Sequence, residues 1–240
     1  MTGQFDGMWH TVSNISPSLT ALFGDIGQGG VVRDVKVDTH TGTVDTPFYS
    51  GVGILAINNH GTVVNAFTSG ENACTLCTSE VLSGLVGANY GLIERSGSSA
   101  SVETGGEAAG LVNTNYGRID QSYATGSAVG FLTHGAAAGL VANNYGSVTQ
   151  SFASGRVSSG NRLVMGGICM GCSGLGTDVY WDVQTTGQPS SGGNLPASNG
   201  LTTAQMSNPA SFVGWDFGPT GAWIIPSGAT HPVLRWQVEH

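Results

Sequence analysis

The stretch Gly139–Gly155, GLVANNYGSVTQSFASG, is one of four closely similar stretches in this chain of 240 residues. Gly110–Gly126 reads GLVNTNYGRIDQSYATG, Gly84–Ala100 reads GLVGANYGLIERSGSSA and Ile54–Gly70 reads ILAINNHGTVVNAFTSG. Repetition of this kind is typical of a solenoid, in which each unit stacks on the one before it and equivalent residues form columns. The repeat therefore decides the fold class before any single residue is considered.

Four columns of equivalent residues run through these copies. Each leucine precedes an asparagine by four residues, and an aromatic residue or histidine and then a glycine follow at once. The columns are Leu55, Leu85, Leu111 and Leu140; Asn59, Asn89, Asn115 and Asn144; His60, Tyr90, Tyr116 and Tyr145; and Gly61, Gly91, Gly117 and Gly146. We expect the glycines to form turns and the asparagines to hydrogen-bond along their column.

The spacing of the leucines indicates the kind of solenoid. Successive units are 30, 26 and 29 residues long, and looser copies begin at Leu22 and Ile168. The units are rich in Gly, Ser, Thr, Asn, Val and Tyr, which favour strands and turns over helices. The sequence therefore predicts an all-β fold, a β-helix of about six coils with neighbouring strands ~4.8 Å apart.

The repeat divides the chain into parts. We expect entry strands at 1–18, the β-helix at 19–173, a C-terminal cap at 174–237 and a remnant of a purification tag at 238–240. The ends of a solenoid must be covered, because an open coil offers unpaired backbone groups to other strands. The candidates for covering the first coil are Phe5, Trp9, Val12 and Ile15. In the C-terminal cap, Thr202 and Gln205 form a capping box that predicts a short helix, which Pro209 limits.

Segments of variable length separate the similar stretches, at 38–50, 70–83, 98–108, 127–137 and 156–165. Loops that bulge from one side of a solenoid are where binding specificity usually lies. We therefore expect these segments to be loops and to hold any binding site.

The composition limits the partners of this chain. Charged residues make up 9% and the formal net charge is −8, with Lys36 as the one lysine. There is no basic stripe, so we expect neither nucleic acid nor an anionic membrane as a partner. A signal peptide and a membrane span are also not expected, since no charged-then-apolar leader and no long apolar run occur. We expect the chain to be a piece of a larger secreted polypeptide, monomeric by itself.

One aromatic column has two possible orientations. Its members lie six residues after the turn glycines, and they are Phe67, Tyr123 and Phe152, with Gly97 in the remaining copy. Alternation counted from Val148 points Phe152 into the core, which is the simpler expectation. A bend after Val148 would instead point Ser151 and Ala153 inward and place the aromatic column on the surface, as a stripe for a partner.

Four of the five tryptophans gather near the C-terminus: Trp181, Trp215, Trp223 and Trp236. They favour a plug that buries aromatic rings over the final coil. The alternative is an aromatic platform for carbohydrate.

The cysteines form two CxxC pairs, Cys74 with Cys77 and Cys169 with Cys172. Four thiolates could in principle hold zinc, but the pairs lie in different coils, roughly 15 Å or more apart along the rod at ~4.8 Å per coil. We expect two local disulfides in an oxidising compartment, with redox thiols and metal binding as the alternatives.

No catalytic constellation is evident in the sequence. The histidines are scattered, and no pattern typical of a calcium or cofactor site occurs. Glu94 and Asp120 share a column in successive units, and with Arg95 and Arg118 nearby they indicate a solvated face rather than an acid–base pair. We expect no cofactor, no metal and no enzymatic activity.

The repeat also resembles a known family. The segments that carry the resemblance are Gly84–Gly91, Gly110–Gly117 and Gly139–Gly146, the SYATG and SFASG that follow two of them, the entry Phe5–Asn14 and the ending Tyr180–Trp236. They are similar to the GLUG repeat family. The resemblance implies a right-handed parallel β-helix within large exoproteins of the filamentous-haemagglutinin-like, two-partner-secretion kind, many of them adhesins. Gln28-Gly29-Gly30 departs from the Asn-Tyr-Gly of the family, and Ile54 replaces a glycine.

Together these patterns predict a segment of a bacterial adhesin that is secreted or displayed on the cell surface, as expected for a Gram-negative bacterium. Its role in cell adhesion and virulence would be to bind a protein or glycan on host cells, matrix or another bacterium through loops on one side. The alternatives are a passive stalk that spaces another domain, and, with least support, an enzyme that acts on polysaccharide.

Overall fold

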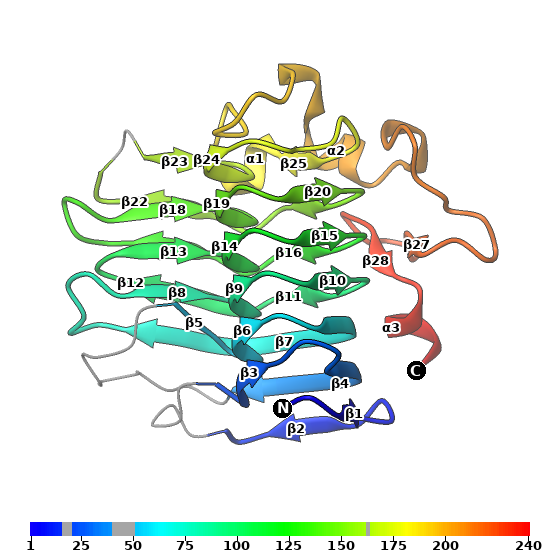
Figure 1. The fold of residues 1–240 in the computed structure, drawn as a ribbon. Helices are drawn as coiled ribbons and strands as arrows, with labels where there is room; N and C mark the ends of the chain where they lie inside the picture. Colours follow the sequence, from blue (N-terminus) through cyan, green and yellow to red (C-terminus); the bar gives the residue numbers. More distant parts are fainter. Residues whose placement is uncertain (16–20, 40–50, 162–163) are drawn as a thin grey trace.

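The computed structural model describes residues 1–15, 21–39, 51–161 and 164–240, which wind into a stack of coils built from short strands (Figure 1). In these residues every strand pair is parallel except β27 (Trp223–Ile224) with β28 (Val233–Leu234). The predicted all-β fold, a parallel β-helix, is confirmed. No helix within the described residues is long and apolar enough to cross a membrane.

The leucine-to-asparagine half of the repeat forms a six-stranded sheet, with one strand from each coil. Its strands are β3 (Phe23–Ile26), β6 (Ala56–Asn59), β9 (Val86–Asn89), β14 (Val112–Asn115), β19 (Val141–Asn144) and β24 (Cys169–Cys172). The register aligns the repeats, because Asn59 pairs with Asn89, Asn89 with Asn115 and Asn115 with Asn144. Each repeat is therefore one coil, as the leucine spacing predicts.

After the Asn–aromatic–Gly corner, the chain forms a second face that belongs to a 15-stranded sheet. Two long strands, β4 (Val31–Thr39) and β7 (Thr62–Cys74), span this face in the first coils. Later coils follow the same path in shorter strands: β10 (Leu92–Glu94), β15 (Arg118–Asp120), β20 (Ser147–Thr149), β11 (Gly97–Ser98), β16 (Tyr123–Ala124), β21 (Phe152–Ala153), β25 (Tyr180–Asp182) and β26 (Gly200–Leu201). At the N-terminal end, β1 (Gln4–Asp6) and β2 (Thr11–Ser13) pair with β4.

We expected loops at 70–83, 98–108, 127–137 and 156–165, but the described residues of each segment include strands of the β-helix, so the expectation was wrong for those parts. They contain β12 (Ser101–Thr104), β17 (Ala128–Gly130) and β22 (Val157–Ser159). They also lead into β8 (Val81–Ser83), β13 (Glu107–Ala109), β18 (Ala136–Ala138) and β23 (Met165–Gly166), which form a five-stranded sheet with β5 (Val52–Gly53). Small residues such as Ala108, Ala128 and Ala137 pack there in a narrow second core. Most of 38–50 lies outside the described residues.

The main core is a set of columns between the two faces. The leucine column and Ile168 have no exposed surface, and the β-branched residues Val63, Ile93, Ile119 and Val148 are buried in the same cluster. Burial of one such side chain stabilises the fold by ~1.5–3 kcal/mol. Because each column repeats in every coil, the core is continuous along the whole rod.

The asparagine column forms a buried hydrogen-bonded ladder. The side-chain amide of Asn59 donates to Oδ1 of Asn89 at 2.8 Å, Asn89 to Asn115 at 2.7 Å and Asn115 to Asn144 at 2.7 Å. The four residues are at most 1% exposed, and their amides are satisfied by one another and by backbone groups, such as the carbonyl of Leu92 for Asn59 and that of Arg118 for Asn89. The expected hydrogen bonds along the column are present.

The turn glycines are required by the close approach of successive coils. A Cβ on Gly117 would lie 2.1 Å from the carbonyl oxygen of Gly91, which no side chain can tolerate. The backbones therefore stack in contact at this corner, and only glycine fits.

A second corner follows the β-branched column, and it decides where the undecided aromatic residues point. Its residues adopt left-handed conformations although none is glycine, with φ of 53° at Asp34, 52° at Asn65, 45° at Arg95, 46° at Gln121 and 41° at Gln150. The chain bends at Gln150, so Ser151 and Ala153 enter the core and Phe152 points away from it. Simple alternation therefore gave the wrong orientation.

The aromatic column nevertheless is not a surface stripe. Phe152 and Tyr123 are 0% and 3% exposed, and Phe67 is partly buried, because the C-terminal part of the chain covers them. That part runs from the last coil back along the outside of the β-helix toward the first coils (Figure 1). We call residues 212–240 the C-terminal strap.

The expected C-terminal cap is therefore mostly a lateral cover rather than a plug over the final coil. Trp215, Trp223 and Trp236 pack with Phe152 and Tyr123 on the side of the β-helix. Trp181 alone lies in the main core, and its indole N–H donates to the carbonyl of Gln188 at 2.9 Å. All four tryptophans are at most 9% exposed, so they form no open platform.

Short helices lie between the last coil and the end of the strap. They are α1 (Val183–Thr186), η1 (Ala197–Asn199), α2 (Thr203–Met206), η2 (Pro209–Ser211) and α3 (Trp236–Glu239). The predicted capping box is present at α2, where Oγ1 of Thr202 accepts from the backbone N–H of Gln205 at 3.2 Å and Gln205 Oε1 accepts from the N–H of Thr202 at 2.9 Å.

At the opposite end, Phe5, Val12 and Ile15 pack against the main core, as expected for residues that cover the first coil. Trp9 does not, since it packs on Trp236 of the strap with ring centroids 5.3 Å apart. The left-handed φ of 64° at Trp9 accompanies this outward position.

Candidate functional site

The most prominent exposed feature is a ladder of aromatic rings at the Asn–aromatic–Gly corner. Ring centroids are 4.5 Å apart between His60 and Tyr90, 5.0 Å between Tyr90 and Tyr116, and 5.2 Å between Tyr116 and Tyr145. The planes are parallel to within 5°, 10° and 16°. Tyr90, Tyr116 and Tyr145 are 47%, 52% and 62% exposed. We call these four residues the tyrosine ladder.

The backbone beneath the tyrosine ladder holds it in place. The N–H groups of Tyr90 and Tyr116 donate to the carbonyls of Asn59 and Asn89 at 2.7 Å, and that of Tyr145 to Asn115 at 2.8 Å. The buried asparagine ladder lies directly inside, and the turn glycines let successive corners stack in contact. A partner would therefore meet rings that are already ordered, which reduces the entropy lost on binding.

Both ends of the tyrosine ladder present a ring face that no other described ring covers. At the C-terminal end, Ser173 follows in the next coil, with its N–H donating to the carbonyl of Asn144. At the N-terminal end, the first coil carries Gln28-Gly29-Gly30, and a hollow of about 380 Å³ lies between Gly27, Gln28, His60 and Tyr90.

The aromatic residues considered as binding candidates from the sequence do not share this exposure. Phe67, Tyr123, Phe152, Trp181, Trp215 and Trp223 lie in the core or under the strap. The tyrosines were recognised only as repeat positions. Their place at the tip of a tight turn, directly after a buried asparagine and before an obligatory glycine, was the signal that could have revealed them as an exposed stripe.

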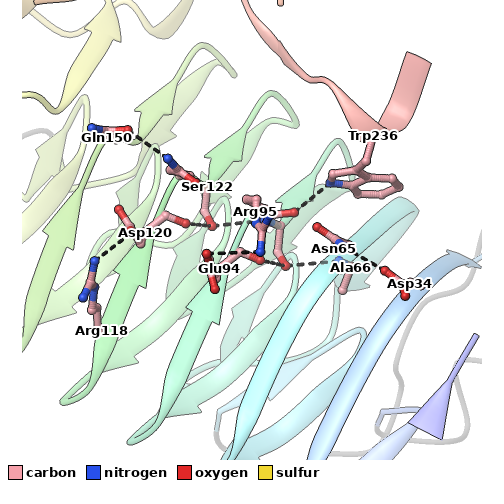
Figure 2. Close-up of polar contacts among 12 residues, drawn as sticks. Asp34, Asn65, Ala66, Glu94, Arg95, Arg118, Asp120, Ser122, Gln150 and Trp236 are labelled. Atoms are coloured by element: carbon pink, nitrogen blue, oxygen red, sulfur yellow. Dashed lines mark hydrogen bonds and ion pairs between the residues drawn. The ribbon is translucent and has the colours of Figure 1, made fainter. Parts of the chain in front are cut away.

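Polar side chains at the left-handed corner form a column of hydrogen bonds, and the strap contacts this column (Figure 2). At this corner the backbone hydrogen bonds between neighbouring strands are interrupted, and hydroxyl groups of buried serines accept in place of carbonyls. Ser96 Oγ accepts from the N–H of Ala66 at 3.1 Å, and Ser122 Oγ accepts from the N–H of Ser96 at 3.2 Å. Asn65 donates to Asp34 at 2.8 Å and Gln121 to Gln150 at 3.1 Å, so the side chains pair along the column.

Arg95 is the member of this column that meets the strap. Its carbonyl accepts from Trp236 Nε1 at 2.9 Å, and its guanidinium lies 3.3 Å from Glu94 (Figure 2). A cavity of about 330 Å³ lies here, bounded among others by Arg235 and Glu239. Arg235 is occupied with the carbonyls of Gly218, Gly221 and Trp223, so it serves to fold the strap.

Glu94 and Asp120 are neighbours in register, as the repeat predicts. Each carboxylate is paired with an arginine of its own coil, Glu94 with Arg95 at 3.3 Å and Asp120 with Arg118 at 2.7 Å. Thr149 also donates to Asp120 at 2.6 Å. This arrangement is a network of partly exposed ion pairs.

Two tyrosines under the strap have displaced pKa values. Burial raises the pKa of Tyr123, although its hydroxyl donates to Gln237 at 2.8 Å. Burial also raises the pKa of Tyr180, whose hydroxyl donates to the carbonyl of Val213 at 3.2 Å. Both phenols stay neutral in the folded chain and act as structural donors to the strap.

The four cysteines form two local disulfides, Cys74–Cys77 and Cys169–Cys172, with Cα atoms 5.3 and 6.1 Å apart. The part of the chain that the structure describes contains no group of three or more His, Cys, Asp or Glu residues placed to hold a metal ion.

Comparison with known proteins gives no relative: no family model, no curated protein and no solved structure matches this chain. A rigid, exposed row of rings on a regular scaffold can bind a partner without reacting with it.

Proposed function

We propose that this chain is a β-helical segment of a secreted or cell-surface bacterial adhesin, which binds a ligand and does not catalyse a reaction. The ligand would be a protein or glycan on a host cell, in the matrix or on another bacterium. The resemblance of the repeats to the GLUG family supports a place within a larger exoprotein of the two-partner-secretion kind. Two disulfides support an oxidising, extracytoplasmic setting.

The observation that carries this proposal is the exposure of the tyrosine ladder. Three tyrosines that each keep about half their surface in water are unusual as packing elements, and tyrosine is enriched where proteins bind partners. The segments expected to be binding loops contain strands of the β-helix, so the proposed contact surface is the ladder rather than those segments.

The test is a cell- and matrix-binding assay with the purified chain. We expect saturable binding by the unmodified chain, and at least a tenfold loss in a variant with Tyr90→Ser, Tyr116→Ser and Tyr145→Ser. The matched control is Leu76→Ser, which removes an apolar side chain, 77% exposed, from the Cys74–Cys77 turn. If only the Leu76→Ser variant lost binding, the contact surface would be the Cys74–Cys77 turn and not the tyrosine ladder.

The second candidate is a passive stalk, favoured by the continuous core and the regular stack of coils. It predicts that the unmodified chain binds no cell, matrix protein or glycan. An enzyme that acts on polysaccharide is the least supported candidate, and new reducing or unsaturated sugar ends in the same assays would favour it.

A further inference from the structure

The tyrosine ladder has no member in the first coil of the β-helix. The first coil lies under His60 in regular register, since Ile26 pairs with Asn59 and the N–H of His60 donates to the carbonyl of Ile26 at 2.7 Å. The turn of this coil is Gly27–Gly30, without an aromatic residue. One face of His60 stacks on Tyr90, and no described ring lies on its other face. The ladder therefore has an empty stacking position.

The shape of this position suits one ring. It opens into the hollow of about 380 Å³ between Gly27, Gln28, His60 and Tyr90, within the usual range for small-ligand sites of ~300–1,000 Å³. Gly29 has φ of 77°, and no atom lies within 4 Å of the position a Cβ would take there. Gly27 follows Ile26 as His60 follows Asn59, so a residue without a side chain stands in register with the aromatic residues of the other coils.

The groups around the hollow differ from those around a site for a purely apolar ring. The hollow presents the rings of His60 and Tyr90, the exposed amide side chain of Gln28 and the backbone of Gly27. A pyranose has this pattern of needs, because its C–H face packs on an aromatic ring while the hydroxyls at its edge require donors and acceptors. The acidic chain, with net charge −8, favours a neutral ligand over an anionic one.

We propose that a neutral pyranose of a glycan stacks on the free face of His60, in the position of the missing ring, with the Gln28 amide hydrogen-bonded to its hydroxyls. This inference rests on the proposed function and names the ligand class for the N-terminal end of the tyrosine ladder. An aromatic side chain of a protein partner fits the ring face but makes no use of the Gln28 amide.

The experiment is NMR titration of the isotope-labelled full chain with methyl glucoside, methyl galactoside and methyl mannoside. At least one glycoside should shift the His60 ring signals saturably. Saturation-transfer signals of that glycoside should fall at least tenfold with His60→Ala and at least threefold with Gln28→Ala. They should be retained with His60→Tyr, which keeps a stacking face, and with Tyr145→Ala at the far end of the ladder.

Other outcomes overturn the inference. If N-acetyltyrosinamide shifts the His60 signals and no glycoside does, the site takes aromatic side chains. Equal loss of signal with Tyr145→Ala and His60→Ala would mean that the glycoside does not select the N-terminal end. If no glycoside shifts the His60 signals while cell binding still requires Tyr116, the inference of a sugar site is wrong. The proposed binding function is then unaffected.

Discussion

The indole nitrogen of Trp236 donates a 2.9 Å hydrogen bond to the backbone carbonyl of Arg95, across 141 positions of the chain. The bond joins the last helix of the strap to the left-handed corner of a central coil (Figure 2). On its other side, the Trp236 ring packs on Trp9 near the first strands. One side chain thus connects the end of the strap to the middle and the beginning of the β-helix.

Replacement of Trp236 should therefore destabilise the whole chain. We expect Trp236→Ala to lower the free energy of unfolding by ~3–5 kcal/mol, and Trp236→Phe, which removes mainly the hydrogen bond, by a smaller amount. Urea titration followed by circular dichroism measures both. The control is Val238→Ala, in the same helix and 55% exposed, which should change little. A Trp236→Ala chain as stable as the control would show that the strap is not anchored here.

The asparagine ladder predicts a dependence on position. Asn115→Ala should lower the free energy of unfolding by ~2–4 kcal/mol, because it leaves Oδ1 of Asn144 buried without its donor and removes the shortest hydrogen bond of the Asn89 amide, which keeps only bonds of 3.3 Å to the carbonyls of Gly91 and Arg118. Asn59→Ala, at the end of the ladder, removes three side-chain hydrogen bonds, to Asn89, Leu92 and Gly61, against four at Asn115, and should cost less. Equal losses at the two positions would contradict a ladder whose members depend on one another.

At the Asn–aromatic–Gly corner, substitutions at adjacent positions should affect stability and binding in opposite ways. Gly117→Ala should be strongly destabilising, since its Cβ would meet the carbonyl oxygen of Gly91 at 2.1 Å. Tyr116→Ser should change the free energy of unfolding by only about 1 kcal/mol or less, because the ring is half exposed, while it weakens binding. Thermal unfolding of the two variants distinguishes the roles, and a large loss of stability in Tyr116→Ser would make the ladder structural.

Alkaline pH should weaken the packing under the strap. Burial raises the pKa of Tyr123 above its ordinary value, so the folded chain holds the phenol proton where the unfolded chain releases it. Its contribution to stability is fully present below the unfolded pKa, ~10, and declines above it by up to ~1.4 kcal/mol per pH unit. Urea titrations between pH 8 and about 11 should show a shallower decline for Tyr123→Phe than for the unmodified chain. Identical slopes would mean that another group controls the alkaline transition.

The disulfide of the narrow second core should contribute modestly. Cys74–Cys77 closes a short loop, for which chain entropy gives ~2 kcal/mol. We expect the Cys74→Ser, Cys77→Ser double variant to unfold at a lower temperature but to keep the β-helix, as seen by circular dichroism. A reductant should shift the unmodified chain in the same direction. An unchanged Tm in both experiments would show that this disulfide is not a stabilising element.

The repeat could be predicted from the sequence because each copy is a continuous stretch and the chain contains several similar copies. Leu111, Asn115 and Gly117 each occupy a position whose neighbours in the next coils are the same residue type, so fold class and register follow together. The disulfides also follow from spacing, since cysteines in distant coils cannot meet.

The missed features depend on conformation or on distant contacts. Arg95 and Gln150 are left-handed although they are not glycines, so the sequence gives no sign of the bend. Alternation therefore predicted the wrong side-chain orientation after this corner. The path of the strap depends on contacts such as Tyr123 with Gln237, which lie 114 positions apart and have no sequence pattern. The tyrosine ladder was visible as a repeat, but its exposure follows from the geometry of the turn.

The strap also changes how the rod can come apart. In a simple solenoid each coil touches only its neighbours, so an end coil can fray while the rest persists. Here, loosening of the first strands would disturb Trp9 and with it Trp236, and release of Trp236 would uncover Tyr123 in the central coils. The rod is thereby coupled lengthwise, and it should resist stepwise peeling and proteolytic trimming until it yields as one unit.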